Sequence, residues 1–157
     1  MNLKQLNILL ADDDIDDCIF FKEALEEFTL SSNLTTVHDG EQLMQLLTDE
    51  TNQLPNILFL DINMPRKNGF ECLSEIKLSK KLKQLPVIMF STSFEQEVVN
   101  LLYSGGAHYF IRKPPEFSQF KKIIYQTLAL VLKELPDNDI RIVAQPTREN
   151  FVLTVEN

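Results

Sequence analysis

The sequence predicts an α/β domain with a doubly wound, five-stranded parallel sheet and helices on both faces. Short, continuously apolar runs such as Ile8-Leu9-Leu10-Ala11 and Ile57-Leu58-Phe59-Leu60 are typical of strands that are buried on both faces. These runs alternate with segments whose apolar residues recur every three or four positions, the spacing of amphipathic helices. Strict alternation of this kind requires right-handed crossover connections and therefore a parallel sheet.

Each expected strand is an apolar or β-branched run bounded by turn residues or proline. Pro55 precedes the third run and Pro86 begins the fourth, and proline is tolerated at the first residue of a strand. The expected strands are residues 8–11, 34–38, 56–60, 87–90 and 108–112.

Each expected helix carries an apolar stripe, and most begin or end at a recognisable cap. Asp14 is an N-cap for the first helix, and Gly69 opens the third. Ser93 with Gln96 forms a capping-box signature for the fourth helix, which the glycine pair at Gly105 ends. The helices are expected around residues 15–30, 43–47, 69–76, 93–104 and 116–134.

Length and composition indicate one soluble domain with a tail. The chain has 157 residues, 44% hydrophobic and 24% charged, with no apolar stretch long enough for a membrane span and no signal peptide, so we expect a cytoplasmic protein. Its net charge of −8 argues against nucleic-acid binding. The expected domain is residues 1–135, followed by an extension, 136–157, too short for a core of its own. Cys18 and Cys72 are expected to be buried thiols.

Charged residues directly follow three of the expected strands. Asp12 and Asp13 follow the first strand, Asp61 follows the third, and Lys113 follows the fifth. The carboxyl ends of parallel strands meet at one edge of the sheet, so these side chains should form a single site. An acidic pair with a further Asp can hold a divalent metal, and the Lys can bind an anion. The combination indicates phosphoryl transfer to an aspartate.

These motifs resemble the receiver domain of bacterial response regulators of the single-domain, chemotaxis-regulator type, over about residues 5–135. The matching segments are Asp12-Asp13, Asp61-Ile62-Asn63-Met64-Pro65 with Gly69, Ser91, and Lys113-Pro114. The resemblance implies a flavodoxin-like strand order, 2-1-3-4-5, and a cis peptide bond at Lys113-Pro114.

The resemblance also implies a two-component mechanism. Asp61 would accept a phosphoryl group from a histidine kinase or a phosphotransfer protein, and Lys113 would bind one phosphoryl oxygen. Mg²⁺, for which Mn²⁺ can substitute, would be bound by Asp13 and Asp61, by Asp12 through water, and by the backbone carbonyl of Asn63. Beyond its own phosphorylation and dephosphorylation, the protein would catalyse nothing.

The same resemblance assigns a switch. The Ser91 hydroxyl would move toward the phosphate, and Phe110 would then rotate inward and change the surface of the fourth helix, fifth strand and fifth helix for an unknown output protein. Asn63, Thr92 and Ser93 would tune access to Asp61, although Ser93 also fits a helix cap. Asp17, the Thr92-Ser93 pair and the long last helix resemble stand-alone regulators, some of which pair with bacteriophytochromes or other sensor histidine kinases.

Three alternative functions fit the residues less well. A metal-dependent phosphohydrolase also uses an Asp nucleophile, but it needs a second Asp two residues later as general acid, and that position is Asn63. A phosphorylation-independent interaction module would usually have lost Asp61 or Lys113. No helix-turn-helix follows residue 135, which argues against a transcription factor. His38 and His108 are expected to be structural.

The last helix and the tail suggest an interface. The helix has more apolar positions than one core-facing stripe needs, so we expect Ile123 and Leu130 to face outward or sideways. Residues 140–143 and 151–155 are apolar, and they are expected to form short strands or an extended arm that packs on its own subunit or on the partner subunit. A homodimer through the side of the fourth and fifth helices would bury these groups.

Overall fold

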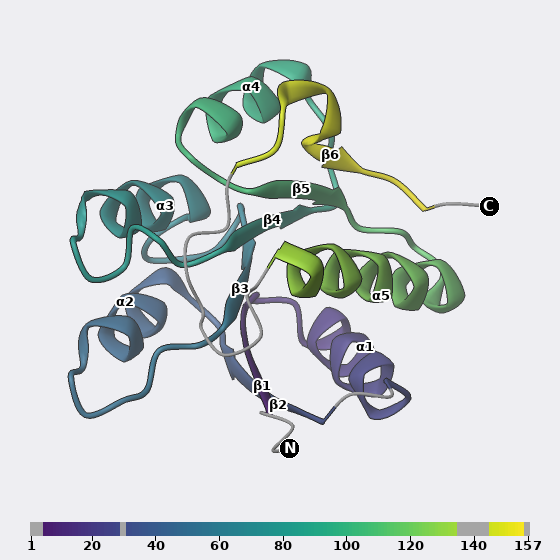
Figure 1. The fold of residues 1–157 in the computed structure, drawn as a ribbon, viewed down its shortest axis with the longest axis horizontal. Helices are drawn as coiled ribbons and strands as arrows, with labels where there is room; N and C mark the ends of the chain where they lie inside the picture. The colour runs from purple at the N-terminus through teal and green to yellow at the C-terminus, as the bar shows by residue number, and fades with distance from the viewer. Residues whose placement is uncertain (1–4, 29–30, 135–144, 156–157) are drawn as a thin grey trace.

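The computed structural model describes residues 5–28, 31–134 and 145–155, and it contains one parallel sheet (Figure 1). The strand order is β2-β1-β3-β4-β5-β6, and every neighbouring pair is parallel. The predicted order 2-1-3-4-5 is therefore confirmed, and a sixth strand extends it. The strands are β1 Leu6–Ala11, β2 Ser32–Val37, β3 Ile57–Asp61, β4 Val87–Ser91, β5 Tyr109–Arg112 and β6 Val152–Leu153.

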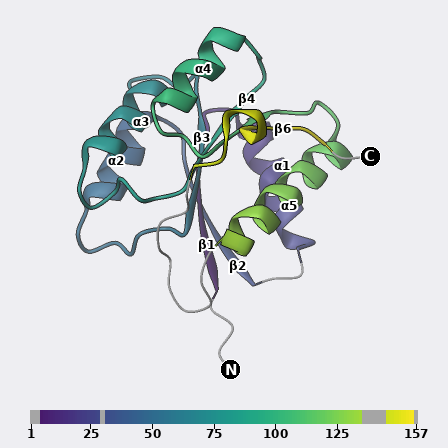
Figure 2. The ribbon, with the colours of Figure 1, turned by 45° about the horizontal axis from the view of Figure 1, so that its top comes forward.

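Five α-helices cover the two faces of the sheet. Helices α1 and α5 lie on one face and α2, α3 and α4 on the other (Figures 1 and 2). The two cores enclose Cys18 and Cys72, which are free and buried as expected. Within the described residues, no helix combines the length and the apolar character needed to cross a membrane. The helices are α1 Ile15–Glu26, α2 Gly40–Thr48, α3 Gly69–Leu78, α4 Gln96–Ser104 and α5 Phe117–Glu134.

The capping predictions had mixed outcomes. Asp14 is the N-cap of α1, because its side chain accepts hydrogen bonds from the amides of Asp16 and Asp17. The capping box predicted at Ser93 is wrong: α4 begins at Gln96, and its N-cap residue makes no side-chain hydrogen bond. The Ser93 amide and hydroxyl instead lie 3.3 Å from the Ser91 hydroxyl. The pattern failed because this local contact holds the segment outside the helix.

The sixth strand comes from the C-terminal extension. Val152 and Leu153 pair in register with Phe110 and Ile111 of β5, and the Phe110 amide donates a 3.0 Å hydrogen bond to the Phe151 carbonyl. The segment that contains Phe151 therefore forms a strand, one of the two forms expected for it. The other apolar part of the tail, residues 140–143, lies outside the described residues.

The prediction that Ile123 faces outward is wrong. Its side chain is only 1% exposed, and it belongs to the core between α1, α5 and the sheet. Leu153 and Val155 pack against the same core, and the Gln126 side chain donates to the Thr154 carbonyl at 3.0 Å. The added strand widens the face that α5 covers, so this helix buries a broader apolar stripe than five strands would require. Leu130 is half-buried against that core.

Candidate functional site

Three carboxylates form an acidic cluster at the carboxyl edge of the sheet. Asp12 follows β1, Asp61 ends β3, and one oxygen from each of Asp12, Asp13 and Asp61 lies within 4.8 Å of the others. Asp12 and Asp61 are buried, whereas Asp13 is exposed. Hard divalent cations such as Mg²⁺ and Mn²⁺ are bound by oxygen ligands of this kind. The donor set therefore fits a divalent metal ion.

Backbone groups hold two of these carboxylates in place. Asp12 Oδ1 accepts a 2.9 Å hydrogen bond from the Asp14 amide, and Asp61 Oδ1 accepts a 3.4 Å bond from the Asn63 amide. Both donors lie two residues after the carboxylate, in the loop that leaves the strand. This local arrangement keeps the cluster at the strand ends and leaves Asp13 free to turn toward solvent.

Gly69 lets the α3 helix approach the cluster closely. A Cβ atom at this position would lie 2.4 Å from the Asp61 carbonyl oxygen, which is shorter than any ordinary contact. The Gly69 amide donates to the Ile62 carbonyl at 2.8 Å. The glycine predicted to open α3 is thus required by the loop that follows Asp61.

Lys113 brings the positive charge into the same pocket. Its Nζ lies 2.7 Å from Asp12 Oδ2 and 3.8 Å from Asp61 Oδ2, and it sits 5.1 Å from the centre of the Phe90 ring. The Lys113 amide donates to the Ser91 carbonyl at 2.7 Å, so the ends of β4 and β5 are tied together. No cis peptide bond occurs among the described residues, so the cis bond implied at Lys113-Pro114 is not present. The trans form is the intrinsically favoured one.

Burial and charge together set the protonation of the pocket. Burial raises the pKa of Asp61 to about 8, with the Asp12 carboxylate acting in the same direction and Lys113 against it. Burial alone would lower the pKa of Lys113, but Asp12 and Asp61 outweigh it and raise that pKa above its ordinary value. Lys113 is therefore a permanent cation, while Asp61 needs more positive charge nearby to ionise fully at neutral pH.

The expected switch residues lie beside the cluster. Ser91 ends β4 and is buried, Thr92 and Ser93 are exposed in the loop that follows it, and Asn63 is exposed after β3. Phe110 is completely buried under α4, with its ring centre 5.9 Å from that of Phe94.

Sequence reasoning missed one contact of the site, a 2.8 Å ion pair between Asp17 Oδ2 and Lys113 Nζ. Asp17 lies in the first turn of α1, where an acidic residue is already explained by the helix dipole. The position of Asp17 in the sequence could have indicated this contact. The first turn of α1 directly follows Asp12 and Asp13, so one side of that turn faces the edge of the sheet that carries the acidic cluster.

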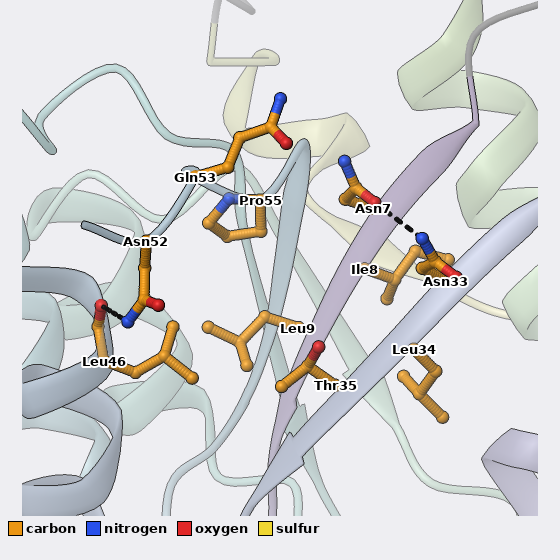
Figure 3. Close-up of a pocket in the computed structure, with 10 residues that line it drawn as sticks. All are labelled: Asn7, Ile8, Leu9, Asn33, Leu34, Thr35, Leu46, Asn52, Gln53 and Pro55. Atoms are coloured by element: carbon orange, nitrogen blue, oxygen red, sulfur yellow. Dashed lines mark hydrogen bonds between the residues drawn. The ribbon is translucent and has the colours of Figure 1, made fainter. Parts of the chain in front are cut away.

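Other candidate positions are structural. His38 Nδ1 lies 3.1 Å from the Asp12 carbonyl oxygen, and His108 Nδ1 accepts from the Val87 amide at 3.1 Å. A cavity of about 340 Å³ near the amino ends of β1 and β2 is lined by neutral side chains, including Asn7 and Asn33, which bond to each other (Figure 3). It lies at the opposite end of the strands from the acidic cluster and offers no titratable side chain.

The fold and the site together define a receiver, and comparison with known proteins agrees. Residues 8–125 match the model of the response regulator receiver domain family, and the chain belongs to that family. It is a two-component response-regulator receiver, a phospho-acceptor signalling protein with an acidic site of Asp12, Asp13 and Asp61 and a lysine at 113. The phosphohydrolase alternative is thereby set aside.

Relatives include regulators associated with phytochromes. Response regulator Rcp1 from Synechocystis sp. is 31% identical over 121 residues, which cover 74% of this chain and 82% of Rcp1. The Mn²⁺-bound structure of Rcp1 aligns with a TM-score of 0.77 and 28% identity, over 83% of this chain and 97% of that one. The phosphorylated cyanobacterial phytochrome response regulator RcpA aligns with a TM-score of 0.79 and 30% identity, over 85% and 98%. The predicted resemblance to the phytochrome-associated group is confirmed.

Proposed function

We propose that Asp61 is the residue that accepts the phosphoryl group, with Mg²⁺ bound by Asp12, Asp13, Asp61 and the Asn63 carbonyl. The observation that carries this assignment is the convergence of three carboxylates and Lys113 at the ends of three strands, with Asp61 nearly enclosed. Labelling by acetyl phosphate, which should require Asp61, is the test.

The charges around Asp61 explain how the site would promote phosphoryl transfer. The P–N bond of a phosphohistidine donor breaks as a P–O bond forms to Asp61, and the freed imidazole nitrogen keeps the electron pair and takes up a proton from solvent. Negative charge spreads over the phosphoryl oxygens during transfer. Lys113 donates to one of these oxygens. A divalent ion held by Asp12, Asp13 and Asp61 would supply further positive charge at this position and favour the ionised form of Asp61.

Measurements of metal affinity should distinguish Asp13, a proposed metal ligand, from Asp14, the N-cap of α1. Asp13→Ala removes a member of the acidic cluster, so we expect Mg²⁺ and Mn²⁺ binding measured by calorimetry to fall below detection. Asp14→Ala removes only the N-cap of α1, so it should cost about 1 kcal/mol of stability and leave metal affinity within about twofold. Equal losses in both variants would contradict the assignment.

Metal affinity should also depend on pH, because the pKa of Asp61 is raised to about 8. A divalent ion must displace the Asp61 proton below that pH, so the affinity of the wild-type protein should rise between about pH 6 and pH 8. Binding that is flat over this range would contradict the proton displacement.

For the switch, we propose that Ser91 donates to the phosphoryl group and that Phe110 transmits the change. Ser91 would exchange its contact with Ser93 for a phosphoryl oxygen, which frees the loop before α4. Phe110 already lies inside the fold, so the expected inward rotation has no counterpart in this conformation. We propose instead that Phe110 stays in the core and transmits the change through its contact with Phe94, in the loop before α4.

The surface expected to control an output protein is partly covered by the chain itself. Residues 145–155 cross the edge of β5, where Gln145 donates to the Tyr103 and Ala107 carbonyls and the Tyr103 hydroxyl donates to the Pro146 carbonyl. An output partner on this side would therefore contact the tail together with α4. We propose that the tail is a part of the output surface.

The homodimer expected from the sequence loses two of its supports, but α4 offers an exposed leucine as a different one. Ile123 is buried and Phe151 packs within its own subunit, but Leu101 on α4 is 63% exposed. We propose that α4 carries the contact between subunits, so Leu101→Glu should lower association in sedimentation velocity, with and without beryllofluoride. A wild-type protein that sediments as a monomer in both conditions would remove the homodimer.

The family implies a histidine-kinase donor, and we propose a phytochrome-type sensor kinase in particular. The likeness to RcpA and to the bacteriophytochrome response regulator RtBRR, which aligns with a TM-score of 0.69 and 27% identity over 92% of this chain and 86% of that one, supports this proposal. Exposed Ile15 and Ile19 on α1 offer an apolar contact beside the acidic cluster for such a partner. Phosphotransfer from the sensor kinases of the source genome, compared in red and far-red light, tests it.

A further inference from the structure

Two carboxylates hold the Lys113 ammonium more closely than the proposed acceptor does. Lys113 Nζ lies 2.7 Å from Asp12 Oδ2 and 2.8 Å from Asp17 Oδ2, but 3.8 Å from Asp61 Oδ2. Both short distances are typical of charge-assisted hydrogen bonds. An ammonium has three N–H donors, so Lys113 can keep both contacts and still offer one donor toward Asp61.

Asp12 and Asp17 differ in what else they can bind. Among the described residues, the acidic cluster consists of Asp12, Asp13 and Asp61, and Asp17 is outside it. A divalent cation in the cluster would therefore be bound by Asp12, whereas the Asp17 carboxylate would keep its ion pair with Lys113. The backbone of Asp17 is also held in place, because its amide donates a 3.3 Å hydrogen bond to Asp14 Oδ1 in the first turn of α1.

Lys113 has little freedom to find another partner. Its side chain is 4% exposed, compared with 17% for Asp17, and it is flanked by the Phe90 ring. The ammonium is thus held in place by a carboxylate on α1, a different element from β5, which Lys113 follows.

We propose that Asp17 is a positioning residue for phosphoryl transfer, which holds the Lys113 ammonium beside Asp61 and offsets its charge toward the divalent cation. This inference rests on the proposed function. The ammonium and the metal ion repel each other across the shared cluster, and the Asp17 carboxylate weakens that repulsion. The same carboxylate repels the negatively charged phosphoryl group and offsets part of the Lys113 charge that attracts it. Asp17 therefore favours the cation and disfavours the anion.

The isosteric substitution Asp17→Asn removes the charge and keeps a hydrogen-bond acceptor. We expect Mn²⁺ affinity, measured by electron paramagnetic resonance of the free ion, to fall about three- to tenfold. Beryllofluoride affinity at saturating Mg²⁺, measured by fluorine NMR, should rise by a similar factor. Asp16→Asn is the matched control, because it removes the same charge from the same turn at an exposed position that makes no contact with Lys113; it should change either affinity by less than about twofold.

The direction of the two shifts decides the question. Opposite shifts for cation and anion support the positioning role, because a merely structural lesion would lower both affinities. A loss of both affinities, no change in either, or equal shifts in Asp16→Asn would overturn the inference. Failure of the proposed function would be seen separately, as a wild-type protein that takes no phosphoryl group or an Asp61→Asn variant that is still labelled.

Discussion

Replacing Asp61 with Asn is expected to abolish phosphorylation by acetyl phosphate in the presence of Mg²⁺. Asn offers a neutral amide in place of the carboxylate that forms the new P–O bond, while its size and shape leave the pocket intact. Intact-protein mass spectrometry should show one added phosphoryl group on the wild type and none on the variant.

The matched control for this experiment is Asp14→Asn. Asp14 lies in the same acidic run but caps α1, and Asn is an equally good N-cap, so labelling and stability should both stay close to wild type. Equal labelling of wild type and Asp61→Asn would show that another group accepts the phosphoryl.

The second large effect concerns stability. Phe151→Ala is expected to lower the free energy of unfolding by about 3–5 kcal/mol, the usual cost of removing a buried phenylalanine ring. The Phe151 side chain is 1% exposed, its ring centre lies 5.1 Å from that of Tyr103, and its carbonyl accepts the Phe110 amide. Its loss would leave a cavity under α4 and weaken the pairing of β6 with β5. Urea unfolding followed by circular dichroism measures the change.

Phe94→Ala provides the comparison, since it removes the same ring from a position that is 40% exposed. We expect it to cost about 1 kcal/mol or less, in line with the smaller area that it buries. If Phe151→Ala cost no more than Phe94→Ala, the docking of the tail against α4 and β5 would be wrong.

The sequence was sufficient for the five-stranded fold because each strand is an apolar or β-branched run with its own local signal. Residues 57–61 and 87–91, for example, are buried throughout, as a sheet covered on both faces requires. The sixth strand was expected only as a short strand or an arm, because it has two residues, follows Pro146, and pairs with a strand far away in the chain. The error at Ile123 has the same origin, because Leu153 of β6 and Val155 pack against the core that contains Ile123.

The site was predictable to the extent that it depends on strand ends. Asp12, Asp61 and Lys113 each follow an apolar run, so topology alone brings them together. The Asp17–Lys113 pair depends instead on the rotation of α1 and on the reach of a lysine side chain, neither of which is encoded in spacing. The capping box expected at Ser93 failed for a different reason. The sequence pattern is present, but Ser93 contacts Ser91 and α4 begins only at Gln96.

Location of the phosphoryl group by chemical trapping tests the central claim most directly. Borohydride reduces an aspartyl phosphate to homoserine, so peptide mass spectrometry of the reduced protein identifies the residue that was modified. After acetyl phosphate and Mg²⁺ treatment of the wild-type chain, we predict homoserine at position 61 and at no other aspartate. Homoserine at position 12 or 13, or a label that survives borohydride unchanged, would contradict the account.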